Sequence, residues 1–184
     1  GGDERVSGSV VYDHVTATTR LLDHLSAAGA HRIAAVLPPD GTAWSRDVAD
    51  AYAAWTAGRG DDPLSRRIGF IPTAAEVAAA VDDLLTIAEV DAIVVVPSGS
   101  AAPALDSAHR AGRRVGEDLL LAAYVDEPLH GLLTPSVTSF DLEPRDVGAA
   151  CVALLAEVWD ADPHARVRAI QPRLLVRDST SRAR

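Results

Sequence analysis

Short apolar runs alternate with helical stripes along the whole chain. The runs are rich in Val, Ile and Leu and favour strands; they cover residues 9–12, 33–37, 67–71, 92–96, 119–123, 137–140 and 169–176. Between most of them, apolar side chains recur at the three- and four-residue spacing of an amphipathic helix, over residues 16–28, 48–55, 73–88, 100–111 and 144–158. This alternation predicts an α/β domain, built on a parallel sheet with helices on both faces.

Local signals mark several helix boundaries. Thr73 and Glu76 have the spacing of a capping box, which predicts a helix start at this point. Gly29 and Gly112 follow two of the helical stripes and can adopt the left-handed conformation that ends a helix. Pro144 suits the first turn of the last helix, where its missing N–H costs nothing.

Composition excludes several classes of protein. The chain has 184 residues and a net charge of −9, and all 17 of its basic residues are Arg. So acidic a chain is not expected to hold DNA or an acidic membrane by itself, since such binding needs positive charge. The single cysteine, Cys151, excludes a disulfide framework and a cysteine-built zinc site. We expect its thiol to be buried as a small apolar group.

No membrane partner is expected, because no apolar stretch reaches the roughly 18 residues that a membrane span needs. Residues 1–5 carry charges with no apolar run behind them, so the sequence shows no signal peptide and predicts a cytoplasmic location. The chain does not begin with Met, and we expect it to be a piece of a longer protein.

Motifs for catalysis are largely missing, so we expect no enzyme, no cofactor and no metal; the six histidines are scattered. A small enzyme stays an alternative that would rest on Ser98 or Asp126. Ser98 lies in a Gly-containing stretch between a buried strand and a helix, where an anion could bind or a Ser could cap the helix. Asp126 follows the strand at 119–123, where parallel sheets place ligands. Trp44 precedes a helix and is a candidate stacking platform for a ligand.

Five short motifs resemble, in order and spacing, those of the effector-binding domain of the lactose/galactose-repressor (LacI/GalR) family. In chain order, the motifs are Asp13-His14, Gly29-Ala30-His31-Arg32-Ile33-Ala34, Gly112-Arg113-Arg114-Val115-Gly116-Glu117-Asp118-Leu119, Thr134-Pro135-Ser136-Val137-Thr138-Ser139 and Leu175-Val176-Arg177-Asp178-Ser179-Thr180. The last four of these are similar, in the same order, to the family's G-H-x-x-I, G-x-x-V-P-x-D-I, x-P-x-L-T-T and L-V-x-R-x-S-T.

The resemblance implies a periplasmic-binding-protein-like fold of type I, in which two Rossmann-like lobes close over a small ligand. It implies that this chain is mostly the C-terminal lobe, over residues 9–136. Residues 137–165 would then cross to an absent N-terminal lobe, residues 166–178 would form a return strand, and residues 179–184 a tail. The family's DNA-reading headpiece would lie before Gly1.

Departures from the family pattern bear on the ligand. Val48, Pro97 and Val125 stand where the family usually has groups that hydrogen-bond a sugar. Sugar hydroxyls need paired donors and acceptors. We therefore expect an effector less polar than a typical sugar, or a pocket that has lost its ligand and serves as a scaffold. The candidate ligand-binding residues are Trp44, Arg46, Ser98 and Asp126, with Arg46 reaching in from a neighbouring turn.

The function implied by the resemblance is the effector-binding and dimerisation part of a bacterial transcriptional regulator, which couples a small molecule to operator DNA through the headpiece. A homodimer is expected. The family's contacts would draw on the helix at 100–111 and on an exposed-looking loop, through Ala101, Ala102, Leu105, Leu132 and Leu133. The alternative with the same fold is a solute-binding protein that serves a transporter.

Overall fold

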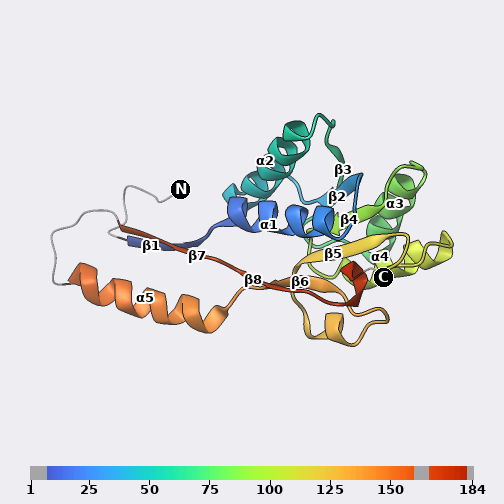
Figure 1. The fold of residues 1–184 in the computed structure, drawn as a ribbon. Coiled ribbons are helices and arrows are strands. Elements are labelled where there is room, and N and C mark those ends of the chain that lie inside the picture. The colour runs from blue at the N-terminus through green and yellow to red at the C-terminus, as the bar shows by residue number, and fades with distance from the viewer. Residues whose placement is uncertain (1–7, 160–165, 182–184) are drawn as a thin grey trace.

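The structure, a computed structural model, describes residues 8–159 and 166–181 (Figure 1). Its strands are β1 (Gly8–Tyr12), β2 (Ile33–Leu37), β3 (Leu64–Arg67), β4 (Ala92–Val95), β5 (Leu120–Val125), β6 (Thr138–Asp141), β7 (Arg166–Ile170) and β8 (Arg173–Leu175). Its helices are α1 (His14–Ala27), α2 (Ala43–Gly58), α3 (Ala74–Leu85), α4 (Ala101–Arg110) and α5 (Pro144–Trp159), with short 3-10 turns η1 (Pro128–Gly131) and η2 (Asp178–Thr180).

A six-stranded sheet with α1 to α4 forms what we call the body. Its strand order is β3-β2-β4-β5-β6-β8, and all neighbours are parallel except the antiparallel pair of β6 and β8. Alternate strand residues point to opposite faces: Ala35 packs in the core with α1 and α2, whereas Val36 packs in the core with α3 and α4. The predicted parallel sheet with helices on both faces is therefore confirmed.

Helix caps explain where the helices of the body begin. The backbone N–H of Thr73 donates to Glu76 over 2.8 Å, and the N–H of Glu76 donates back to the Thr73 hydroxyl over 3.2 Å, so the predicted capping box is present. A second reciprocal box, between Thr42 and Ser45, starts α2. The sequence pattern does not reveal this second box, because Ser replaces the usual Glu or Gln at its third position.

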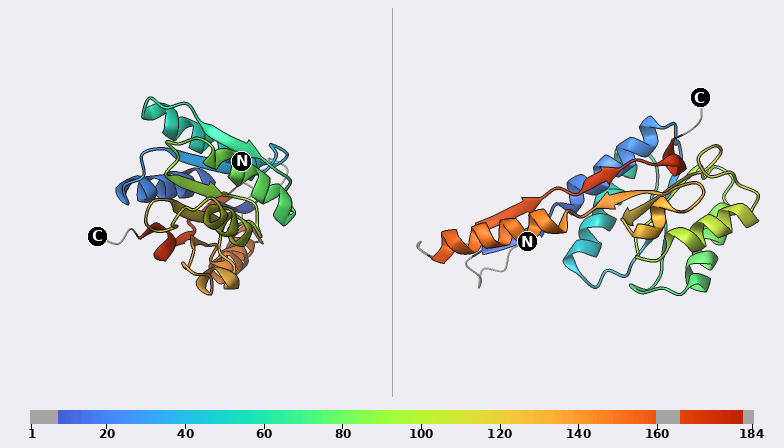
Figure 2. Two further views of the ribbon diagram at one scale, coloured as in Figure 1. Left: turned by 90° about the vertical axis from the view of Figure 1, so that its right-hand side faces the viewer. Right: turned by 90° about the horizontal axis from the view of Figure 1, so that it is seen from below.

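The helix α5 and the parallel pair β1 and β7 form what we call the arm, which projects from one side of the body (Figures 1 and 2). Only Leu154 of α5 is buried, and it lies directly over Gly8 of β1. Cys151 is exposed, so its expected burial is wrong. The reason is that α5 packs on β1 and β7 along one stripe, with no layer against its other sides among the described residues.

Two strand predictions need correction. The strand expected at 67–71 ends at Arg67, and Ile71 is 95% exposed, because the chain leaves the sheet once Ile68 has bonded to the carbonyl of Leu37. The single strand expected at 169–176 is divided into β7 in the arm and β8 in the body. The break falls at Pro172, because proline has no N–H to donate to a neighbouring strand.

The expected polar tail at 179–184 is in part built into the body. Ser179 and Thr180 are buried, and residues 182–184 lie outside the described part. The Ser179 hydroxyl donates to the carbonyl of Leu121 over 2.6 Å, and the Thr180 hydroxyl lies 2.8 Å from the His24 ring. These buried polar groups are therefore paired, and they fasten the end of the chain to β5 and α1.

Candidate functional site

A cavity of about 260 Å³ opens at the carboxyl edge of the parallel sheet. Its walls come from the ends of β1 and β5, the starts of α1 and α2, and the segments that follow β3, β4 and β6. Open parallel sheets place their ligands at this edge, because the loops that leave neighbouring strands meet there. The cavity is therefore the candidate binding site.

Aromatic rings form much of the cavity wall, with His14 at their centre. The His14 ring centroid lies 5.8 Å from Tyr12, 6.0 Å from Trp44 and 5.9 Å from Tyr124. Trp44 in turn lies 6.1 Å from Phe70. All four pairs are tilted, at spacings at which aromatic rings attract one another. The rings thus support each other around a common space.

Two members of this aromatic group, His14 and Tyr124, are hydrogen-bonded to each other. The Nδ1 atom of His14 lies 3.0 Å from the Tyr124 hydroxyl, and the hydroxyl of Thr18 donates to the same oxygen over 3.4 Å. Burial lowers the pKa of His14 and raises the pKa of Tyr124 to about 12. Both side chains are therefore uncharged near neutral pH.

The rest of the wall is mostly aliphatic: it consists of Val96, Pro97, Val125 and Leu142, with one hydroxyl from Ser98. Two of the three departures from the family pattern, Pro97 and Val125, thus lie on the cavity. The third, Val48, is 1% exposed and packs in the core beneath α2 instead. A wall of this kind offers few partners for the hydroxyls of a sugar.

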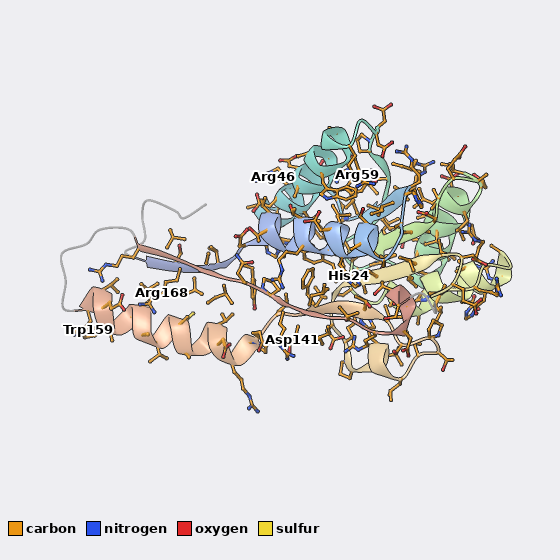
Figure 3. The ribbon with its side chains drawn as sticks, in the orientation of Figure 1. His24, Arg46, Arg59, Asp141, Trp159 and Arg168 are labelled. Atoms are coloured by element: carbon orange, nitrogen blue, oxygen red, sulfur yellow. The ribbon has the colours of Figure 1, made fainter. Side chains whose placement is uncertain are left out.

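The four candidate ligand-binding residues separate in the structure. Trp44 and Ser98 line the cavity. Arg46 lies on α2, is exposed, and donates to the carbonyl of Asp40 over 3.2 Å, so it does not reach the cavity (Figure 3).

Asp126 is held by its own chain. It accepts hydrogen bonds from Arg177 over 2.8 Å and from Ser139 over 2.6 Å. Burial raises the pKa of Asp126, but the bonds from Arg177 and Ser139 outweigh burial and keep that pKa below its usual range. Asp126 lines a separate hollow of about 360 Å³ that shares Tyr12, Val125 and Leu142 with the aromatic cavity.

The expected anion site at the start of α4 is occupied by a carboxylate of the chain itself. The N–H of Gly99 donates to Oε1 of Glu127 over 2.7 Å. The alternative reading, a serine cap, is not realised at Ser100, whose hydroxyl makes no cap bond and is buried without a partner among the described residues. Glu127 thus supplies the negative charge that the helix N-terminus favours.

The five residues expected at a dimer interface differ in accessibility. Ala101 and Leu105 are buried against the sheet of the body, so they are not available to a second copy. Leu132 is 80% exposed, Leu133 packs partly on the core, and Ala102 is half-buried. Ala101 and Leu105 lie on α4, within the helix predicted at 100–111, but their side chains lie on its inner face.

Four of the cavity's aromatic residues were not among the candidates: Tyr12, His14, Phe70 and Tyr124. A usable signal was present for three of them. Tyr12 and Tyr124 lie at or near the carboxyl end of a strand, and His14 starts the helix that follows β1. Phe70 carries no such signal, because it reaches the cavity only through the path of the segment after β3.

Three histidines make stability depend on pH. Burial lowers the pKa of His14, His24 and His130 below the value of about 6.5 that an unfolded chain has. Below about pH 6.5 the unfolded state then binds more protons than the folded state, so stability present at neutral pH is lost as pH falls through the folded pKa values.

We therefore expect the free energy of unfolding, measured with urea, to decrease between about pH 7.5 and about pH 5.5. The variant His24→Gln should weaken this dependence, whereas His31→Gln, at an exposed position, should not. A flat profile over this range for the unaltered chain would contradict the expectation.

Comparisons with known proteins bear on the fold and the family of the chain. The profile of the family described as "periplasmic binding protein-like domain" matches residues 22–180. The chain belongs to this family. Among curated proteins, the ribose operon repressor of Halalkalibacterium halodurans is 32% identical over 92 residues, which is 50% of this chain and 28% of that protein.

Solved structures of LacI-family regulators have the same fold. A LacI-family transcriptional regulator from Mycobacterium smegmatis is 25% identical with a TM-score of 0.76, covering 97% of this chain and 67% of that one. A regulator from Arthrobacter sp. FB24, in complex with lactose, is 24% identical with a TM-score of 0.78, covering 95% and 67%. A sugar-binding regulator from Escherichia coli, in complex with phosphate, is 21% identical with a TM-score of 0.79, covering 93% and 62%.

The periplasmic binding protein-like fold expected from the motifs is thus confirmed, as is the resemblance to LacI-type regulators. The chain spans about two thirds of the length of these solved chains and 28% of the curated relative. In the described part of this family member, no helix is long and apolar enough to cross a membrane, and no three His, Cys, Asp or Glu side chains come together to hold a metal ion.

Proposed function

We propose that the chain is the effector-binding part of a LacI-type transcriptional regulator, and that it binds in the aromatic cavity a small molecule with fewer hydrogen-bonding groups than a typical sugar. The observation that carries the proposal is the position and lining of this cavity, at the carboxyl edge of the sheet. Its named relatives are regulators and not enzymes or transport proteins, which supports this function over the two alternatives.

The cavity touches two of the three connections between body and arm. Tyr12 and His14 flank the first connection, and Leu142 lies in the second. Side chains also bond across these connections. Gln171, in the third, donates to Asp13, in the first, over 2.7 Å. Arg173, at the start of β8, donates to Glu143 in the second and lies 2.9 Å from the Asp141 carboxylate at the end of β6. A ligand in the cavity would therefore affect how the arm is oriented relative to the body.

We assign the arm to a second lobe. Residues 9–136 would form most of the C-terminal lobe, residues 137–165 would cross to the other lobe, and residues 166–178 would return. A ligand that favours one orientation of the lobes changes DNA affinity by a coupling free energy, typically about 1–3 kcal/mol.

The proposed partners follow from charge and exposure. A net charge of −9 assigns operator contact to a headpiece outside this chain. A homodimer in the cytoplasm completes the proposal, with Ala102, Leu132 and Leu133 as the accessible members of the expected interface.

Chromatin immunoprecipitation of the intact gene product tests the regulatory function. We expect discrete enriched promoter sites, and we expect a gel-shift assay on those promoters to detect the intact product but not the 184-residue chain, whose charge is −9. Deletion of the gene should change transcription from the same promoters. Absence of enriched promoters, together with unchanged transcription, would overturn the proposed function.

A further inference from the structure

We propose that the aromatic cavity binds an organic cation, with an ammonium group seated among the rings. The inference rests on the proposed function, because it names the ligand class of the same cavity. It is carried by two observations, the cage of aromatic rings that lines the cavity and the carboxylates near that cage.

The cage comes from four separate parts of the chain. Tyr12, Trp44, Phe70 and Tyr124 line the cavity, and His14 lies between three of them. A cation within about 6 Å of an aromatic centroid is attracted by the negative face of the ring, and several rings around one space make an aromatic cage for alkylated ammonium groups. A volume of about 260 Å³ suits a small ligand of this type.

Three carboxylates act electrostatically on the tyrosines of the cage, those of Asp13, Asp47 and Asp141. Burial is the main cause of the raised pKa of Tyr124, and the charges of Asp13 and Asp47 raise it further. Burial also raises the pKa of Tyr12, to which the charge of Asp141 adds. Asp141 lies where the arm meets the body, in the hollow that adjoins the cage (Figure 3).

The nearby guanidinium groups are engaged outside the cage. Arg173 pairs with Asp141, and Arg177 pairs with Asp126. Within the described residues Asp47 forms no ion pair, and no Arg lines the cavity. Burial also keeps His14 uncharged near neutral pH. Arg173 thus offsets the charge of Asp141, whereas no ion pair of the described residues offsets the charge of Asp47.

Other ligand classes fit this cavity less well. An anion would meet the surrounding carboxylates, and the N–H of Gly99 already donates to Glu127. A sugar would leave most of its hydroxyls unpaired against Pro97, Val125 and Leu142. An uncharged apolar ligand fits the rings but gains nothing from the charge of Asp47. Charge is therefore the property to vary in a test.

Choline and 3,3-dimethylbutan-1-ol make a matched pair of probes, because they share one shape and differ by the positive charge. We expect calorimetric titration of the 184-residue chain to detect choline, and to find the neutral alcohol at least about ten times weaker, as one decade corresponds to about 1.4 kcal/mol of cation–π and charge attraction. Equal affinity for the two probes, or no binding of choline, would overturn the cation proposal.

Two pairs of variants locate the effect. Asp47→Asn should weaken choline binding about five-fold or more and leave the alcohol unchanged, whereas Asp50→Asn, the same change at an exposed position of α2, should alter neither. Trp44→Leu should remove choline binding, whereas Trp159→Leu, at the outer end of α5, should not. If both members of either pair behave alike, the ligand does not sit in the cage.

The two proposals fail separately. Promoter binding without any affinity for choline would support the regulatory function and overturn the proposal that the ligand is a cation. Choline binding without promoter sites would retain the cation site and remove the regulatory function.

Discussion

Gly116→Ala should lower the free energy of unfolding by about 2–4 kcal/mol. Gly116 is buried and has a φ of +89°, a conformation that L side chains rarely adopt. A Cβ at this position would lie 2.8 Å from the carbonyl oxygen of Asp178, so the backbone of η2 would have to move. Because η2 carries Ser179 and Thr180, this movement would also disturb their buried hydrogen bonds.

Gly112→Ala is the matched control for this prediction. Gly112 has a similar φ of +74°, but an added Cβ would meet no atom within 4 Å. The variant should therefore lose about 1 kcal/mol of unfolding free energy, because only the unfavourable positive φ of an Ala at this position acts against it. Urea unfolding of both variants measures the difference. Equal losses of unfolding free energy in the two variants would show that the contact with Asp178 does not contribute to the effect.

The same geometry explains one departure from the family pattern. Gly116 stands where the related motif has Pro, whose ring holds φ near −65°. A φ of +89° is out of reach for Pro, so this turn follows a path of its own. That path lets the backbone of Asp178 approach Gly116 closely.

Arg177→Met should cost about 2–4 kcal/mol, the second large effect we expect. The Nη1 atom of Arg177 donates to Asp126 over 2.8 Å, to the carbonyl of Val137 over 2.6 Å and to Ser139 over 2.8 Å. Both charged side chains are largely buried, at 20% and 24% exposure. Removing the guanidinium would leave the Asp126 carboxylate with the Ser139 hydroxyl and with the His130 ring, whose Nδ1 lies 3.6 Å away and which burial keeps uncharged near neutral pH.

A double-mutant cycle separates the ion pair from the other contacts of Arg177. Asp126→Asn removes the charge of the partner, and the double variant should lose less stability than the sum of the single variants. Asp82→Asn and Arg110→Met form the control cycle, because that ion pair lies on the surface and should contribute at most about 1 kcal/mol. Additive losses at Arg177 and Asp126 would contradict a coupled pair.

The closing motif, residues 175–180, shows what a sequence motif predicts and what it leaves open. Residues 175–180 resemble the closing pattern of the family, and the structure shows which contacts this segment makes. Arg177 binds Asp126, and Ser179 and Thr180 bind β5 and α1. A motif match alone could not show this, because the partners lie tens of residues away in the chain.

The sequence by itself determined the fold class, most helices and strands, and the two apolar positions Pro97 and Val125 of the cavity wall. Such features depend on local periodicity, capping and short motifs, which act over a few residues. The departures from family-type sugar contacts were also readable, since they are single residues within those motifs.

Only the tertiary structure decided which side chains share the cavity. Tyr12, Trp44, Phe70 and Tyr124 come from four parts of the chain and meet because parallel strands bring their carboxyl ends to one edge. The tertiary structure likewise decided that Asp126 is bound by Arg177 and does not line the aromatic cavity. The sequence could not show this pairing, because the two residues lie 51 positions apart. Burial depends on the layers around an element, which is why the periodic stripe of α5 did not predict that Cys151 is exposed.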